Sequence, residues 1–192
     1  MNPWFAKAII LVGTLSVLII PASLHRGAET RVVKSGKGPL EVALLAIAAL
    51  GFLPALLWVA TPLLAFADYA LRPIPYFAGV LFSGLGLWLL YRSHADLGTN
   101  WSVTLEVRER HSLITRGIYR SVRHPMYLGL LLYAAGQALL LPNWLAGPSY
   151  LVAISLLFCL RVGPEERMML AEFGDDYQAY TARTKRLIPG VW

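Results

Sequence analysis

The sequence predicts an all-α integral membrane protein with five transmembrane helices and an amphipathic helix at the C-terminus. Hydrophobic residues make up 57% of the 192-residue chain and charged residues only 15%, whereas soluble domains carry about 25% charged residues. The hydrophobic residues also gather into five runs of roughly the 20 residues that a membrane-spanning helix needs. These runs are residues 4–24, 40–67, 76–91, 126–141 and 144–160.

The three N-terminal runs each carry a local signal. Run 4–24 holds one charged residue, Lys7, and lacks a convincing small-residue cleavage site, so we expect a retained helix and not a signal peptide. In the second run, Pro54 and Pro62 predict a kink. The third run contains glycines that would let a neighbouring helix approach closely: Gly79, Gly84 and Gly86.

The last two runs are joined by only Pro142 and Asn143, a turn signal, and therefore predict a tight antiparallel hairpin. Run 126–141 would be roughly 24 Å long at the helical rise of about 1.5 Å per residue, slightly short of a full span. We therefore expect this hairpin to pack inside the bundle, with its open end at one membrane surface.

Basic residues are concentrated on one side of the predicted topology. Segments 25–39, 92–125 and 161–192 contain 15 of the 17 lysines and arginines. The positive-inside rule therefore places these segments in the cytoplasm and the N-terminus outside, in the inner membrane if the chain is bacterial. Topology thus accounts for the net charge of +6, and we expect no nucleic-acid partner.

Several chemistries lack their sequence motifs. No G-x-G-x-x-G loop follows a strand, and the Walker, H-E-x-x-H and G-x-S-x-G motifs do not occur. The single cysteine, Cys159, excludes a disulfide framework. We expect no metal site, because no ligand spacing links the four histidines, His25, His94, His111 and His124.

The tail from residue 161 predicts an amphipathic helix. Pro164 suits a first helical position, and an apolar stripe follows it: Met169, Phe173, Tyr177 and Tyr180. Arg161 and Glu165 lie four residues apart and would share a face of a continuous helix. Pro164 leaves open whether the helix is continuous there.

Two stretches together resemble the isoprenylcysteine carboxyl methyltransferase family, especially its short prokaryotic members. They are HSLITRGIYRSVRHPMYLG at 111–129 and RVGPEERMMLAEFGDDYQAY at 161–180, followed by R-x-I-P at 186–189. The resemblance covers roughly residues 92–192. It implies one membrane domain, 1–192, with the first three helices in 1–91. Residues 92–192 would form the catalytic part, in which the loop and the C-terminal helix close a cofactor pocket.

The resemblance implies S-adenosyl-L-methionine as the cofactor and assigns residues to it. Arg161 matches the catalytic and substrate-binding arginine that holds the acceptor's carboxylate. Gly163 and Pro164 depart from the longer acidic run of eukaryotic members, which leaves open whether Glu165 or Glu166 faces the pocket. The matching cofactor-binding positions are His111, Ser112, Leu113, Ile114, Tyr119, His124, Pro125, Met126, Tyr127 and Glu165.

The implied activity is methyl transfer to the carboxylate of a lipophilic small molecule or prenylated cysteine, with membrane lipid as the surrounding partner. A carboxylate is already ionised at neutral pH, so alignment and charge placement could carry the catalysis. A phospholipid or small-amine N-methyltransferase remains an alternative, because it would use a similar pocket without a carboxylate clamp. A non-catalytic membrane scaffold is a more distant one.

Overall fold

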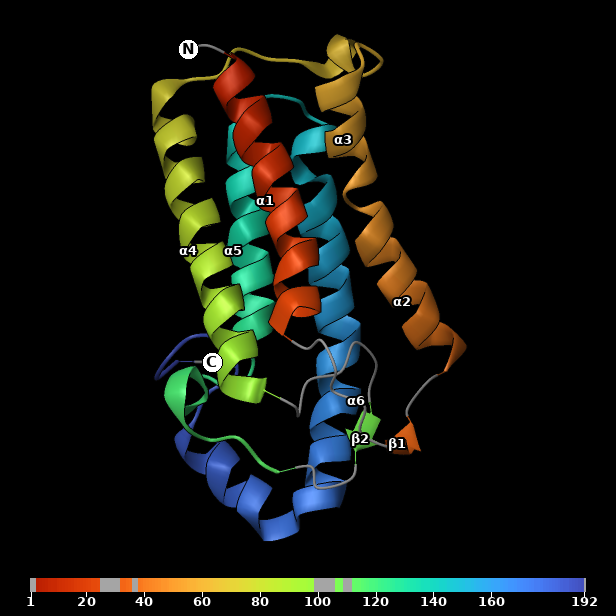
Figure 1. Ribbon diagram of the computed structural model, residues 1–192, viewed down its shortest axis with the longest axis vertical. Coiled ribbons are helices and arrows are strands. Elements are labelled where there is room, and N and C mark those ends of the chain that lie inside the picture. The colour runs from red at the N-terminus through yellow and green to blue at the C-terminus, as the bar shows by residue number, and fades with distance from the viewer. Residues whose placement is uncertain (1–2, 25–31, 36–37, 99–105, 109–111, 192) are drawn as a thin grey trace.

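The protein is a bundle of long helices that run alongside one another (Figure 1). The computed structural model describes residues 3–24, 32–35, 38–98, 106–108 and 112–191. Its main helices are α1 (Pro3–Leu24), α2 (Pro39–Leu50), α3 (Leu53–Ala60), α4 (Pro73–Leu97), α5 (Pro125–Leu140) and α6 (Ala146–Arg183). The predicted all-α membrane class is confirmed.

Four helical segments in the described part are long and apolar enough to cross a membrane, and α5 is a shorter apolar helix. Their outer surfaces carry large apolar side chains, among them Phe5, Trp88 and Val152, each more than half exposed. Lipid can cover such side chains, whereas water would disfavour them. The inner faces meet in a core built mainly from α5 and α6, which includes Tyr133 and Tyr150.

The second predicted run is interrupted just before Pro54. The helix α2 ends at Leu50 and α3 begins at Leu53, while Gly51 and Phe52 between them keep helical backbone angles. Pro54 has no N–H to continue the helical hydrogen bonds, so the interruption predicted at this proline is found. Gly51 lies so close to Ala153 of α6 that a side chain would not fit. The helix ends at Ala60 and not at residue 67, because Thr61 precedes a proline and is extended.

Glycines let α4 and α5 pack backbone against backbone. A Cβ at Gly86 would lie 2.5 Å from the Tyr133 nitrogen, and one at Gly79 would lie 2.9 Å from the Gly136 oxygen. The prediction is confirmed for these two glycines of α4. It is wrong for Gly84, which faces open space.

Asn143 fixes the α5–α6 hairpin at the end of the bundle where α1 begins. Its Oδ1 accepts hydrogen bonds from the backbone nitrogens of Leu145 and Ala146, which caps α6. Its Nδ2 donates to Asp68 Oδ1 at 2.7 Å, and Trp58 donates to the same oxygen. The tight turn is therefore tied to the loop between α3 and α4.

The first part of the tail continues the preceding membrane helix, and a second helical segment follows a sharp turn; α6 names both. The α6 helix continues through Pro164, which places Arg161 and Glu165 on one face, and it turns sharply at Gly174 (φ 52°). That backbone conformation favours glycine. The predicted stripe therefore does not run along one straight helix, and after the turn Tyr177 and Tyr180 are buried.

The described parts of the basic segments lie at one end of the bundle (Figure 1). Strand β1 (Val32–Ser35), from the first of them, pairs antiparallel with β2 (Glu106–Arg108), from the long loop between α4 and α5. Within the described residues, the strands form this one two-stranded sheet beside the helices. The last turns of α6 and the C-terminus lie at the same end (Figure 1).

We expect Gly86→Ala to destabilise the bundle by about 1–3 kcal/mol, because the new methyl group would push α4 away from α5. Gly84→Ala is the matched control, since it adds the same group to the same helix where there is space. Thermal unfolding in detergent, followed by circular dichroism, measures both. Equal unfolding temperatures for the two variants would contradict this account of the interface.

Candidate active site

The loop before α5 is fixed against the end of α4. Gly117 has a φ of +59°, and a Cβ there would collide with the carboxylate of Asp96. That carboxylate accepts a hydrogen bond from the Ile118 nitrogen at 2.8 Å. The short helix η3 (Gly117–Arg120) therefore begins at a defined point, and it carries Tyr119.

Tyr119 is buried between α4 and the last turns of α6. Its hydroxyl donates to the Ser93 backbone carbonyl, and its own backbone carbonyl accepts a hydrogen bond from the Tyr180 hydroxyl at 2.6 Å. Burial, followed by the negative charge of Glu165, raises the pKa of Tyr119 well above its ordinary value. The phenol therefore stays neutral and protonated across the physiological range.

His124 and Pro125 set the direction in which α5 begins. Pro125 occupies the first helical position, where its missing N–H leaves no unsatisfied bond. The His124 backbone nitrogen donates to the Arg186 carbonyl at 3.0 Å, so the start of α5 is paired with the C-terminal segment. The His124 ring is buried and lies 5.8 Å from the Tyr127 ring, measured between centroids.

Glu165 faces the start of α5. Tyr127 donates a hydrogen bond to its Oε2 at 2.8 Å, and His124 Nδ1 lies 3.9 Å from its Oε1. The Glu165 side chain keeps 26% of its surface exposed. It is therefore held in place yet open to a further hydrogen-bond donor.

Glu166, the next residue, joins three segments of the chain. Its carboxylate receives Arg123 Nη2 at 2.8 Å and Arg186 Nη2 at 2.7 Å, and it lies 3.2 Å from His124 Nε2. Burial alone would raise the pKa of Glu166, but the hydrogen bonds from His124, Arg186 and Arg123 outweigh it and hold the pKa well below its usual value. Arg123 also donates to the carbonyls of Thr181 and Thr184.

Arg161 lies one helical turn before Glu165 and pairs with an acid from α2. Its Nη2 is 3.3 Å from Glu41 Oε1, and the exposed fractions of the two side chains are 11% and 6%. The charges of Glu165, Arg161 and Glu41 all act on the Tyr127 hydroxyl. The ion pair therefore lies beside the cluster of His124, Tyr127 and Glu165.

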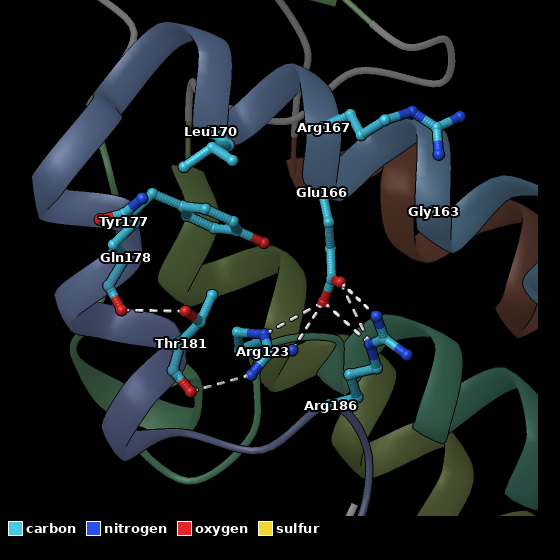
Figure 2. Close-up of a pocket in the computed structure, with 9 residues that line it drawn as sticks. All are labelled: Arg123, Gly163, Glu166, Arg167, Leu170, Tyr177, Gln178, Thr181 and Arg186. Carbon is cyan, nitrogen blue, oxygen red and sulfur yellow. Dashed lines mark hydrogen bonds and ion pairs between the residues drawn. The ribbon is translucent and has the colours of Figure 1, made fainter.

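A pocket of about 440 Å³ opens on the Glu166 side of this cluster (Figure 2). Figure 2 shows Arg123 and Arg186 converging on the Glu166 carboxylate. The lining residues are Arg123, Gly163, Glu166, Arg167, Leu170, Tyr177, Gln178, Thr181 and Arg186. Among the residues that the structure describes, those predicted to bind the donor do not line it.

The structure brings some predicted residues together and leaves others apart. His124, Tyr127 and Glu165 are in mutual contact. Ser112, Leu113 and Ile114 lie in the loop before η3, where Ser112 is exposed and the other two are half-buried. Met126 is half-buried in the first turn of α5. His111 lies outside the described residues.

Sequence reasoning missed three residues of this site. No role was assigned to Arg123, which precedes His124 in the first motif, or to Arg186, which begins the R-x-I-P motif. Neither has a local signal, because each meets Glu166 only through the fold. Glu41 did have a signal, since it is a lone acid in an apolar run, and ionisable residues in such runs are a functional hypothesis by default.

The fold and the site together define a helical membrane protein with a cluster of ionisable side chains at one end of the bundle. Residues 78–171 match the model of the isoprenylcysteine carboxyl methyltransferase (ICMT) family. The resemblance seen in the motifs is therefore confirmed, and the match covers most of α4, all of α5 and most of α6.

Curated relatives carry consistent names. A protein-S-isoprenylcysteine O-methyltransferase of Schizosaccharomyces pombe is 32% identical over 110 residues, covering 56% of this chain and 47% of the relative. The Homo sapiens protein of that name is 30% identical over 115 residues, covering 59% of this chain and 40% of the relative. The chain thus spans about half the length of the curated relatives it matches, or less.

The fold is also similar to a solved structure. It matches the eukaryotic intramembrane Ras methyltransferase ICMT with a TM-score of 0.54 and 25% identity. The match covers 83% of this chain and 55% of the solved chain. The similarity therefore extends to α-helices that precede the family-model match.

We expect Glu166→Gln to destabilise the protein, because it removes the charge that Arg123 and Arg186 share. Breaking a fully buried ion pair from one side costs at least about 3 kcal/mol, but Arg186 is 36% exposed and screened by solvent, so we expect a loss of about 1–3 kcal/mol. Since the pKa of Glu166 is lowered on folding, its contribution is complete above the ordinary value of 4.5 and is lost as the pH falls below it.

Unfolding curves in detergent at pH 7 and at several pH values below 4.5 measure this effect. The variant should unfold at a lower temperature at pH 7 and should lose less further stability on acidification than the wild type. Asp176→Asn, at an exposed position of the same helix, is the control. Parallel curves for the wild type and Glu166→Gln would show that this carboxylate does not hold the segments together.

Proposed function

We propose that the chain transfers a methyl group from S-adenosyl-L-methionine to the carboxylate of a lipophilic acceptor such as an S-prenylated cysteine. The observation that carries the proposal is the Tyr127–Glu165 hydrogen bond, with Arg161 on the same face of α6 one turn away. The family match and the names of the curated relatives support the same reaction class.

The chemistry of the Glu165 cluster fits such a donor. The Glu165 carboxylate is held by Tyr127 and is partly exposed, so it can accept hydrogen bonds from the donor's amino group. The aromatic faces of Tyr119 and Tyr127 can attract a cation. When bound, the donor would supply a methyl group on a positively charged sulfur, which the acceptor can attack in line with the sulfur–methyl bond.

The acceptor's carboxylate needs no general base, because it is ionised at neutral pH. Arg161 can orient it through two parallel hydrogen bonds. Alignment and electrostatic placement can then supply the rate enhancement. An apolar tail on the acceptor would remain among the membrane helices, which gives a physical reason for placing this reaction at a bilayer surface.

One observation favours a second candidate, a phospholipid or small-amine N-methyltransferase. Arg161 already has a buried counter-charge in Glu41, so its charge is neutralised without an acceptor carboxylate. An amine acceptor would leave this ion pair in place. Kinetics with both acceptor classes separate the two candidates.

We further infer that the site faces the cytoplasm. The pairing of β1 with β2 and the position of the C-terminus support one common side for the three basic segments, and the positive-inside rule gives that side. We treat residues 1–192 as one membrane domain in which 92–192 supply most of the catalytic part and α2 adds Glu41.

Arg161→Lys and Glu165→Gln should each impair a different ligand, the acceptor in the first variant and the donor in the second. Lysine lacks the planar fork of arginine, so we expect a loss of roughly 10- to 100-fold in the efficiency of acceptor methylation with little change in donor affinity. Glu165→Gln should weaken donor binding instead. Acceptor kinetics with a farnesylated cysteine analogue and calorimetry with S-adenosyl-L-methionine measure these effects in detergent.

A collapse of donor binding in Arg161→Lys with acceptor kinetics spared would place Arg161 with the donor and remove the carboxylate clamp. Methylation of amine acceptors, but not of carboxylates, by the wild type would favour the second candidate. Failure of the wild type to bind the donor would contradict both enzyme functions.

The orientation predicts a labelling pattern in intact cells. In a Cys159→Ala background, Ser112→Cys and Ala182→Cys lie at the site end, at exposed positions. Both should be protected from a membrane-impermeant maleimide. Leu63→Cys, exposed beyond the far end of α3, should react. The reverse pattern would place the site outside the cytoplasm.

A further inference from the structure

Glu41 is an acid in an otherwise apolar helix. It is the only ionisable residue of α2, whose sequence is PLEVALLAIAAL. Leu40, Val42 and Leu50 of this helix are each at least 60% exposed, whereas Glu41, Leu44 and Ala48 are buried on the side that packs against α6. Glu41 therefore points into the protein and not toward the membrane surface.

The ordinary role of an acid in a first helical turn does not account for this placement. Such an acid interacts favourably with the helix dipole while it remains solvated. Glu41 is only 6% exposed and reaches Arg161 Nη2 on another helix. A buried guanidinium needs a counter-charge, because an unpaired charge in a protein interior is strongly disfavoured. Glu41 supplies that charge.

We propose that Glu41 is an internal stand-in for the acceptor's carboxylate: it pairs with Arg161 and is displaced when the acceptor binds. This inference rests on the proposed function, in which Arg161 holds the acceptor. The Glu41 side chain and an acceptor share the same terminal group, a carboxylate, so each can satisfy the same guanidinium.

The exchange gives the site a preference for the charge state of its ligand. A free acid carries the negative charge needed to compete with Glu41. The methylated product carries none, so Glu41 regains Arg161 after transfer and the product loses its polar anchor. Glu41 therefore lowers the affinity of the substrate somewhat and favours release of the product.

Glu41→Gln tests the proposal by removing the competing charge while an amide oxygen can still accept a hydrogen bond from Arg161. The apparent affinity for the acid is reduced by the fraction of protein in which Arg161 is occupied, so removing the competitor should tighten acid binding by about three- to tenfold. The affinities for the product methyl ester and for S-adenosyl-L-methionine should stay within about twofold.

The measurement is calorimetry in detergent with an S-farnesylated cysteine derivative as the free acid and as its methyl ester. Donor affinity reports whether each variant is folded. Glu41→Asp retains the charge on a shorter side chain, so it should compete less well and shift acid binding in the same direction by a smaller factor. It decides the question if Glu41→Gln does not fold.

Unchanged or weaker acid binding in a variant that binds the donor normally would overturn the role of Glu41 as a competitor. Weaker acid binding would show that Glu41 positions Arg161 for the acceptor. The outcome is separable from failure of the proposed function. If the wild type neither binds nor methylates the acid, the proposed function fails; if it does both and Glu41→Gln matches it, only this inference fails.

Discussion

The half-buried carboxylate of Glu166 forms the ion pairs on which the site depends. It binds Arg123, which precedes α5, and Arg186, which follows α6. Backbone hydrogen bonds from residues 123 and 124 to the carbonyls of 185 and 186 join the same two segments. Separating them would leave two arginines without their shared counter-charge and would open that backbone pairing. The position of His124, and with it the first turn of α5, therefore depends on this carboxylate together with the backbone pairing.

The neighbouring glutamates serve different purposes because adjacent helical side chains point about 100° apart. Glu166 is enclosed by positive groups and holds the tail against the loop. Glu165 meets the neutral hydroxyl of Tyr127 and keeps an exposed edge. A carboxylate saturated by arginines has little capacity left for a ligand, whereas one held by a single hydroxyl does. This difference supports Glu165 as the residue for the donor.

The N-terminal half of the chain does more than complete the bundle. The family match begins at residue 78, yet the counter-charge of Arg161 comes from α2. The helix that carries it packs mainly against α6 and is separated from α3 by the break at Gly51. A motif that lies entirely in the C-terminal half is thus completed electrostatically by a residue outside it. Charge balance in an apolar surrounding requires such a partner from whichever helix is adjacent.

The sequence by itself determined the class of fold, the α5–α6 hairpin and the close approach at Gly79 and Gly86, because hydrophobic run length, turn residues and side-chain size act locally. It also placed Glu165 and Arg161 four residues apart. Only the tertiary structure decided that α6 continues through Pro164 and turns at Gly174, because packing outweighs a single residue's preference. It also decided the partners of Glu166 and Arg161. Those contacts join residues 20 to 120 positions apart, and no periodicity along the chain encodes a charge pair formed across helices.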